Sequence, residues 1–127
     1  MAGMFHDCNK LREINVSGFD TRNVEDFSYM FCRCENLISL DVSKFETSNT
    51  QNMSYMFRDC SLLSSLDLNN FNTKKVLSLL GMFMNCKNLL NLNLSNFDTS
   101  KVTNMLSMFN GCKQIKNFIY LILIQVK

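Results

Sequence analysis

The residues best suited to chemistry in this chain are its cysteines, because thiols bind metals, form disulfides and attack electrophiles. Five of the six cysteines recur at one interval of 26 residues: Cys8, Cys34, Cys60, Cys86 and Cys112. A metal ladder or a set of disulfides is one interpretation of such a column. Each cysteine, however, follows a Met-Phe pair at helical spacing, so we expect it on an apolar helix face as a small buried side chain. The column therefore predicts packing, with no metal and no cofactor.

Two further residues are candidates for reactivity. Cys32 stands outside the column, one helical turn before the next loop, and is predicted to face solvent as the thiol most able to react. With Cys34 it forms a Cys-x-Cys pair, which is a weak metal signal without a second pair. His6 is the only histidine and adjoins Asp7 and Cys8, but no orienting group or closed pocket is evident for a catalytic dyad. We therefore predict a protein that is not an enzyme.

The interval of the cysteines is shared by most of the chain. Met-Phe pairs, phenylalanines and threonines recur at the same step of 26 residues. The pairs begin at Met4, Met30, Met56, Met82 and Met108, the phenylalanines are Phe19, Phe45, Phe71 and Phe97, and the threonines are Thr21, Thr47, Thr73 and Thr99. A fixed period in this range indicates one supersecondary unit stacked on copies of itself, which is a solenoid.

The repeat spanning residues 37–62 shows what each unit contains. It begins with the pattern L-x-x-L-x-L at 37–42, which places three apolar side chains on one side of a short strand. Thr47 or Ser48 then stands where it can cap the first amides of a helix, and apolar residues as far as Cys60 step by three or four. Parallel strands stack at ~4.8 Å, whereas helices need ~8–10 Å. We therefore expect a curved α/β repeat solenoid with parallel strands on the inner wall and short helices on the outer wall.

These units define one repeat domain over residues 1–127. We expect a partial repeat at 1–10, full repeats at 11–36, 37–62, 63–88 and 89–114, and a C-terminal capping strand or truncated repeat at 115–127. Met1 already lies in a repeat column, which suggests a fragment of a larger protein. The apolar run near the C-terminus is far shorter than the ~20 residues that a membrane helix needs, so no membrane span is predicted. A net charge of +2 with dispersed basic residues argues against nucleic-acid binding.

One pattern summarises the repeat: L-x-x-L-x-L-S-x-F-[DE]-T-S-x-V-x-x-M-x-x-M-F-x-x-C-x-x-L. It resembles the BspA-type leucine-rich repeat, a 26-residue repeat of bacterial surface proteins. The best matches run from Phe45 to Cys60 and from Phe97 to Met105, and the resemblance covers residues 1 to about 118. It implies a right-handed leucine-rich-repeat superhelix, a location at the cell surface or outside the cell, and adhesion to a protein partner or a host-surface ligand.

Columns that change between repeats indicate where a partner would bind. The strand positions of the inner wall vary, whereas the leucine, phenylalanine, methionine and cysteine columns stay nearly constant. The variable columns and the polar column beside them give the candidate partner-binding residues Arg12, Glu13, Ile38, Ser39, Asp41, Ser64, Ser65, Asp67, Leu90, Asn91 and Asn93. Asp41 and Asp67 lie one strand apart, so a cation could bridge them, but a solvated polar row is the simpler explanation.

Two functions are compatible with this pattern. The first is a protein-interaction or adhesion module that binds through the variable residues of the inner strands. The alternative is a purely structural segment of a repeat array, which associates only with further repeats. Open solenoid ends also allow self-association.

Overall fold

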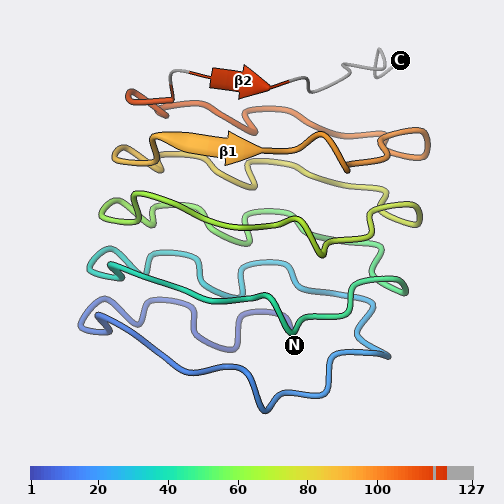
Figure 1. Ribbon diagram of the computed structural model, residues 1–127, viewed down its shortest axis with the longest axis horizontal. Coiled ribbons are helices and arrows are strands. Elements are labelled where there is room, and N and C mark those ends of the chain that lie inside the picture. The colour runs from blue at the N-terminus through green and yellow to red at the C-terminus, as the bar shows by residue number, and fades with distance from the viewer. Residues whose placement is uncertain (116, 120–127) are drawn as a thin grey trace.

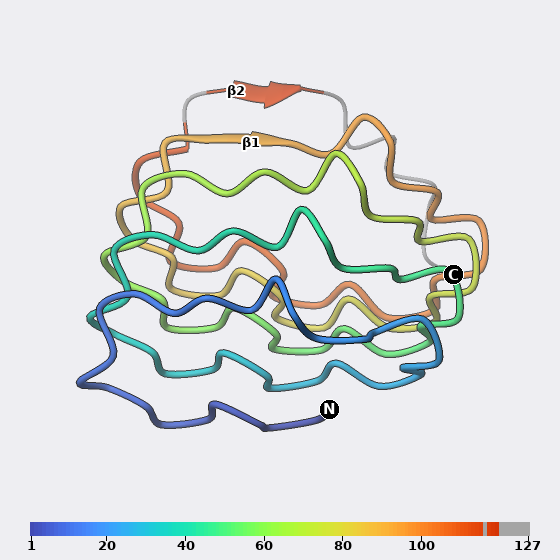
Figure 2. The same ribbon diagram turned by 60° about the horizontal axis from the view of Figure 1, so that its bottom comes forward.

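The computed structural model describes residues 1–115 and 117–119, and through them the chain winds as a stack of coils (Figure 1). Each coil occupies one 26-residue repeat, so equivalent residues of successive coils lie beside one another. Figure 2 shows each coil as a flattened loop with two long sides. We call the side that carries residues 11–16 and their repeats the strand wall. The turn wall is the side that carries 1–8, 27–34 and their repeats.

The strand wall contains the regular strands of the described residues, β1 (Asn91–Asn93) and β2 (Asn117–Ile119). They pair in parallel, in a register that places Asn91 opposite Asn117. In the preceding coil a parallel bridge joins Ser65 to Asn91. The wall is therefore parallel where it is paired, but each of its strands is only three residues long.

The segment 115–127, predicted to be a capping strand or a truncated repeat, contributes β2 to this wall. Residues 116 and 120–127 lie outside the described part of the chain. Because β2 runs in the same direction as β1, residues 117–119 continue the pattern of the earlier coils.

The helices predicted for the second half of each repeat are wrong, because no described residue is helical. The turn wall is a run of tight turns in which alternate N–H groups have different partners. Between Phe27 and Cys34, one set of N–H groups donates to the carbonyl three residues earlier in the same coil. The N–H of Met30, for example, donates to the carbonyl of Phe27 at 3.2 Å. The other set donates to the following coil, as Phe31 does to Met56 at 2.9 Å. The two sets together satisfy the backbone without an α-helix.

Two positions in each run of turns have a left-handed backbone. The φ angle is 59° at Tyr29 and 63° at Arg33, and the equivalent residues of the other coils lie between 56° and 79°. A turn of this kind requires a positive φ at its third residue, where glycine has the least strain. Glycine occupies this position at Gly3, Gly81 and Gly111. The other equivalent positions carry non-glycine residues, whose side chains strain the left-handed backbone.

The error in the helix prediction has a physical cause. Met56, Phe57 and Cys60 lie at positions i, i+1 and i+4, a spacing that fits one face of a helix and equally the inward positions of two successive turns. Turns can hydrogen-bond to the next coil at the strand spacing of ~4.8 Å, whereas helices would hold the coils ~8–10 Å apart. The curved stack was predicted from a difference in spacing between strands on one wall and helices on the other. Without helices, that difference is absent.

The hydrophobic core lies between the two walls and is organised by a ladder of phenylalanine rings. Phe57 is fully buried, and its ring stacks on Phe31 at 5.9 Å and on Phe83 at 5.8 Å between ring centroids. The ladder extends to Phe5 at one end and Phe109 at the other. Each inner coil thus buries its ring against both neighbouring coils, so the coils stabilise one another.

The threonine column joins successive coils at the corner before the turn wall. The buried Thr47 hydroxyl accepts the N–H of Asn72 at 2.8 Å and donates to the carbonyl of the same residue at 3.0 Å. Thr73 bonds Asp98 in the same way. The prediction that Thr47 caps a helix is therefore wrong, and its hydroxyl links two coils instead.

Candidate functional site

The strand wall carries every residue predicted to bind a partner, and each of them is exposed. Ile38 and Leu90 are the apolar members of the set, with 44% and 40% of their surface exposed. Between the exposed positions, Leu40 and Leu66 point inward and are buried. Ser39 and Asp41, on either side of Leu40, face solvent because successive side chains of an extended segment point to opposite sides. Ile38 is exposed next to Ser39, so the alternation does not extend to it. The binding role of the exposed residues stays a prediction.

Two shallow hollows lie along this wall. The larger has a volume of about 850 Å³ and is lined by Glu13, Ile14, Asn15, Ser39, Leu40, Asp41, Ser43, Ser65 and Asp67. The smaller, of about 250 Å³, is lined by Ser65, Leu66, Asp67, Leu68, Asn69, Asn91 and Asn93. The two share Ser65 and Asp67 in their lining, so they adjoin each other along the stack. We call the two adjoining hollows together the strand-wall groove.

The groove brings together most of the predicted residues and adds some that sequence reasoning missed. Arg12, Ile38, Ser64 and Leu90 line neither hollow and flank the groove instead. Ser43 and Asn69 were not predicted. Their spacing, two residues after an aspartate, is the signal that could have identified them, because it is typical of an Asx turn.

The polar column of the groove shapes its backbone. The carboxylate of Asp41 accepts the N–H of Ser43 at 2.9 Å, and Asp67 accepts that of Asn69 at the same distance. The hydrogen bonds from the Ser43 hydroxyl and N–H lower the pKa of Asp41 below its ordinary value. Asn15 and Asn93 form the same bond in their coils. The column is therefore a series of Asx turns that ends each strand segment.

The larger hollow is acidic. Its lining includes the three carboxylates of Glu13, Asp41 and Asp67 and no lysine or arginine, although the chain as a whole has a net charge of +2. The described residues contain no group of three or more histidine, cysteine, aspartate or glutamate side chains that could hold a metal ion. The chemistry of the hollow is therefore that of hydrogen-bond acceptors for a partner that carries donors.

The cysteine column is part of the core, as predicted. Cys34, Cys60 and Cys86 are fully buried, and all six cysteines are free thiols. Each of these three thiols donates to the carbonyl of a phenylalanine in the preceding coil, at 3.1–3.2 Å. Burial raises the pKa of the Cys34 thiol to about 12 and raises those of Cys60 and Cys86 as well. These thiols therefore act as small apolar groups with a weak donor.

The prediction that Cys32 faces solvent and reacts is wrong. Only 1% of its surface is exposed, and burial raises the pKa of its thiol to about 11. The prediction assumed a helix, in which this residue would point outward. In the run of turns it occupies the repeat position of His6 and Arg58 in the neighbouring coils. A buried thiol that stays protonated is a poor nucleophile.

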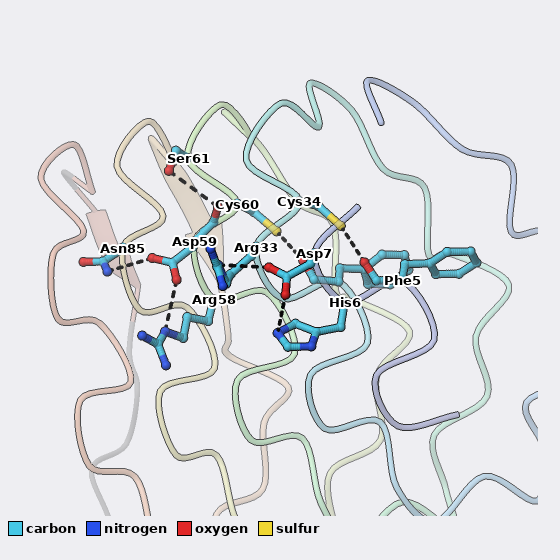
Figure 3. Close-up of polar contacts among 11 residues, drawn as sticks. Phe5, His6, Asp7, Arg33, Cys34, Arg58, Asp59, Cys60, Ser61 and Asn85 are labelled. Carbon is cyan, nitrogen blue, oxygen red and sulfur yellow. Dashed lines mark hydrogen bonds and ion pairs between the residues drawn. The ribbon is translucent and has the colours of Figure 1, made fainter. Parts of the chain in front are cut away.

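The exposed face of the turn wall carries a row of paired charges (Figure 3). Asp7 bonds Arg33 at 3.0 Å, Arg58 bonds Asp59 at 3.1 Å, and Asn85 donates to Asp59 at 2.8 Å. The Asp7–Arg33 pair is solvent-exposed, and a pair of this kind contributes only ~0–1 kcal/mol, whereas Arg58 and Asp59 are partly buried.

His6 belongs to the same face, where Asp7 and Tyr29 are its neighbours. Its Nε2 lies 3.7 Å from the Asp7 carboxylate, and its ring lies 5.9 Å from that of Tyr29. Both contacts are with exposed neighbours at the surface of the turn wall. The Cys8 thiol has no hydrogen bond to this imidazole among the described residues.

The fold and its groove define a class of protein, the leucine-rich-repeat solenoid. The chain is similar to a leucine-rich-repeat protein of T. pallidum whose crystal structure is known, with 26% sequence identity and a TM-score of 0.58. The match covers 91% of this chain and 49% of the other, so the chain spans about half the length of that protein. The predicted repeat solenoid is therefore confirmed at the level of its class.

The family follows from the sequence match. Residues 1–120 match the family described as Mycoplasma protein of unknown function, DUF285, and the chain belongs to it. No curated protein matches the chain. Within residues 1–115 and 117–119, no helix has the length and apolar character needed to span a membrane.

Proposed function

We propose that the chain is a protein-interaction module that binds its partner along the strand-wall groove. One observation supports this most strongly: two adjoining hollows extend across several coils, and their exposed lining changes from coil to coil while the buried columns do not. A fixed scaffold with a variable surface is how solenoid proteins present a binding face. The leucine-rich-repeat class to which the chain is similar supports the same function.

The chemistry of the groove indicates the kind of partner. The carboxylates of Glu13, Asp41 and Asp67 favour a segment that carries lysine, arginine or free N–H groups. Ile38 and Leu90 offer apolar contacts beside these acceptors. A partner segment that presents basic and apolar side chains in alternation would satisfy both features. Apolar anchors beside satisfied polar contacts are where most binding energy is found at protein interfaces.

The groove is preorganised for binding. The Asx turns of Asp41 and Asp67 hold the backbone at the end of each strand segment, and the buried Leu40 and Leu66 anchor it from below. A surface that is already ordered loses little conformational entropy when a partner binds.

The proposal extends to the whole protein. We infer that the repeats are of the BspA type and wind as a right-handed superhelix. We also infer that the protein acts in adhesion at a cell surface. The repeat pattern from Phe45 to Cys60 supports both inferences by resemblance.

Selection of binders from a displayed peptide library tests the proposed face while the natural partner is unidentified. Peptides are selected on the wild-type chain, and their affinities are then compared with a strand-wall variant that combines Arg12→Ala, Ile38→Asp and Leu90→Asp. We expect most selected peptides to lose at least tenfold in affinity, about 1.4 kcal/mol, because two apolar contacts become charges. The variant should keep its thermal unfolding midpoint within a few degrees, since all three side chains are exposed.

A matched control changes one arginine and two exposed leucines away from the groove: Arg22→Ala, Leu77→Asp and Leu106→Asp. This control should leave the affinities unchanged. Peptides that tolerate the strand-wall variant and lose affinity for the control would refute the proposed binding face.

A further inference from the structure

We propose that the turn wall binds the surface of an anionic phospholipid membrane, through the coils at residues 73–87 and 99–113. The turn wall is the long side of each coil opposite the strand wall (Figure 2). In these two coils it carries three leucines that reach solvent, which we call the leucine patch. Leu77 is 44% exposed, Leu106 is 71% exposed and Leu80 is half-exposed. The equivalent residues of the earlier coils are polar or small: Glu25 and Gln51 for Leu77, and Ala2, Ser28 and Ser54 for the other two.

The leucine patch is continuous from one coil to the next. The carbonyl of Leu77 accepts the N–H of Thr103 at 2.8 Å, and the carbonyl of Leu106 accepts that of Gly81 at 2.9 Å. The N–H of Leu77 also donates to the carbonyl of Gln51 at 2.8 Å, so this leucine is exposed although a coil lies on each side of it. The patch therefore belongs to the side of the stack, and its exposure at Leu77 does not depend on an end of the stack.

Positive charge accompanies the leucines in the same two coils. Residues 73–87 and 99–113 contain five lysines and no aspartate or glutamate, whereas the equivalent residues 21–35 and 47–61 contain four carboxylates. The five lysines are Lys74, Lys75, Lys87, Lys101 and Lys113. All are exposed, and none forms an ion pair within the described part of the chain. Asp98, just before the second segment, is half-buried and accepts the N–H of Ser100 at 2.9 Å. The patch thus has a basic margin, which complements an anionic surface.

The backbone of the leucine patch needs no hydrogen bond from a partner. The N–H of Leu80 donates to the Ser78 hydroxyl at 3.4 Å, and its carbonyl accepts the N–H of Tyr55 at 2.8 Å. The N–H of Leu106 donates to the side-chain oxygen of Asn104 at 3.0 Å. With the bonds of Leu77, every backbone polar group of the three leucines is paired, so the patch can leave water without an unsatisfied group.

This pairing favours lipid over protein as the occupant. Protein interfaces add about one hydrogen bond for every 100–200 Å² of contact, and the carboxylates of the strand wall suit such a contact. The leucine patch offers apolar side chains with lysines at its margin. Apolar residues that enter the interface beside basic residues that attract the headgroups are the two features of proteins that lie on anionic membranes.

Two tyrosines extend the patch toward the preceding coils. The half-buried ring of Tyr55 lies directly against Gly81, beside Leu80. Tyr29 is 39% exposed, and its ring centroid lies 5.0 Å from that of Tyr55. A ring that carries a hydroxyl suits the boundary between lipid and water. We therefore place the tyrosines at the edge of the contact. The proposal is independent of the binding role of the strand wall, which lies on the other long side of the coils.

Sedimentation of the whole chain with lipid vesicles tests the proposal. Phosphatidylcholine vesicles with about 30% phosphatidylserine supply the anionic surface, and phosphatidylcholine alone supplies the neutral one. We expect the chain to bind the anionic vesicles at least about tenfold more tightly, because the lysines attract their headgroups. The affinity should fall as salt is added, since salt screens exposed charges.

A pair of matched variants identifies the face that binds. Leu77→Asp with Leu106→Asp should weaken binding to the anionic vesicles at least about tenfold, because two apolar contacts become charges that the surface repels. Ile38→Asp with Leu90→Asp adds the same two charges to the strand wall and should bind within about twofold of the wild type, since these charges face away from the lipid. Both variants should keep the thermal unfolding midpoint of the wild type within a few degrees, because all four side chains are exposed.

A single tryptophan gives a second readout, because the chain has none of its own. The fluorescence of Leu106→Trp should shift to shorter wavelengths when anionic vesicles are added, since the indole leaves water for the lipid interface. The fluorescence of Ile38→Trp, on the strand wall, should not shift.

Four outcomes would overturn the proposal. The first is a wild-type chain that does not bind anionic vesicles at low salt, and the second is equal binding to the anionic and the neutral vesicles. The third is a leucine variant that binds as tightly as its strand-wall control. The fourth is a fluorescence shift at Ile38→Trp without one at Leu106→Trp. A chain that ignores vesicles but binds acidic peptides through Leu77 and Leu106 would assign this face to a protein partner instead.

Discussion

Above pH 9 the folded chain should lose stability steeply, by about 5 kcal/mol for each pH unit, because four buried thiols hold their protons. The pKa of Cys32 is raised to about 11 and that of Cys34 to about 12, from an ordinary value of 9.0, and those of Cys60 and Cys86 are also raised. Burial is the main cause in each case, since the charged thiolate would lose its hydration.

The sign of the effect follows from proton binding. Below pH 9 the thiols are protonated in both the folded and the unfolded chain, and the free energy of unfolding does not depend on them. Between pH 9 and 11 the unfolded chain releases these protons while the folded chain keeps them, so stability falls as the pH rises, by ~1.4 kcal/mol per thiol and pH unit. A domain of ordinary stability, ~5–15 kcal/mol, would unfold within one to three pH units above 9.

Urea unfolding of the reduced chain at half-unit steps from pH 8 to pH 10.5 measures this slope. The double variant Cys60→Ala and Cys86→Ala is the matched comparison. It should be less stable than the wild type at pH 8, because it loses two thiol contacts, but its slope above pH 9 should fall by about half. Equal slopes for the two chains would show that these thiols are not the groups responsible.

Removing one inner ring of the phenylalanine ladder should be the most damaging single substitution in the core. Phe57→Ala is expected to lower the free energy of unfolding by about 3–5 kcal/mol. The ring is fully buried and stacked on both sides, at 5.9 and 5.8 Å, so its loss leaves a cavity that two coils border. Neither neighbour can collapse into the space without breaking the hydrogen-bond ladder of the turn wall.

Phe5→Ala provides the matched control for that experiment. Phe5 belongs to the same column, but it is half-buried in the first coil and has only one ring of the column, Phe31, beside it. Its loss should cost less than half as much as the loss of Phe57. Denaturant unfolding followed by circular dichroism measures both. Similar losses of unfolding free energy for the two variants would mean that stacking against both neighbouring coils does not make an inner ring more stabilising than a terminal one.

The sequence predicted those features that depend only on the repeat and on polarity. The period places Phe31, Phe57 and Phe83 in one column, and burial of that column follows for any stack of identical units. The exposure of Ile38 and Leu90 follows from the pattern L-x-x-L-x-L, in which the leucines point inward and the variable positions between them face solvent. The thiols of the cysteine column were predicted to pack inward because they share the phase of these phenylalanines, which holds for turns as well as for helices.

What the sequence could not predict depends on backbone conformation. The inward residues Met56, Phe57 and Cys60 have the spacing of a helix, and nothing in their types excludes one. The deciding factor is the hydrogen bond between coils, as from Phe31 to Met56, which local propensity does not include. The wrong prediction for Cys32 followed from the same error, since its outward direction was derived from a helix.

The polar columns show a similar limit. Thr47 and Asp41 are residue types that suit a helix cap or a solvated row, and the sequence offers both interpretations. Their actual partners are Asn72 in the next coil and Ser43 two residues on. The first partner depends on the exact register of stacking, and therefore only the second was within reach of sequence reasoning.

The central claim is that the turn wall of each coil is hydrogen-bonded to that of the next coil, with turns where helices would be expected. Far-ultraviolet circular dichroism tests it most directly. We predict a spectrum that lacks the double minimum of α-helix, since no described residue is helical. A helical signal like that of ordinary domains, in which about 30–35% of residues are helical, would contradict the claim.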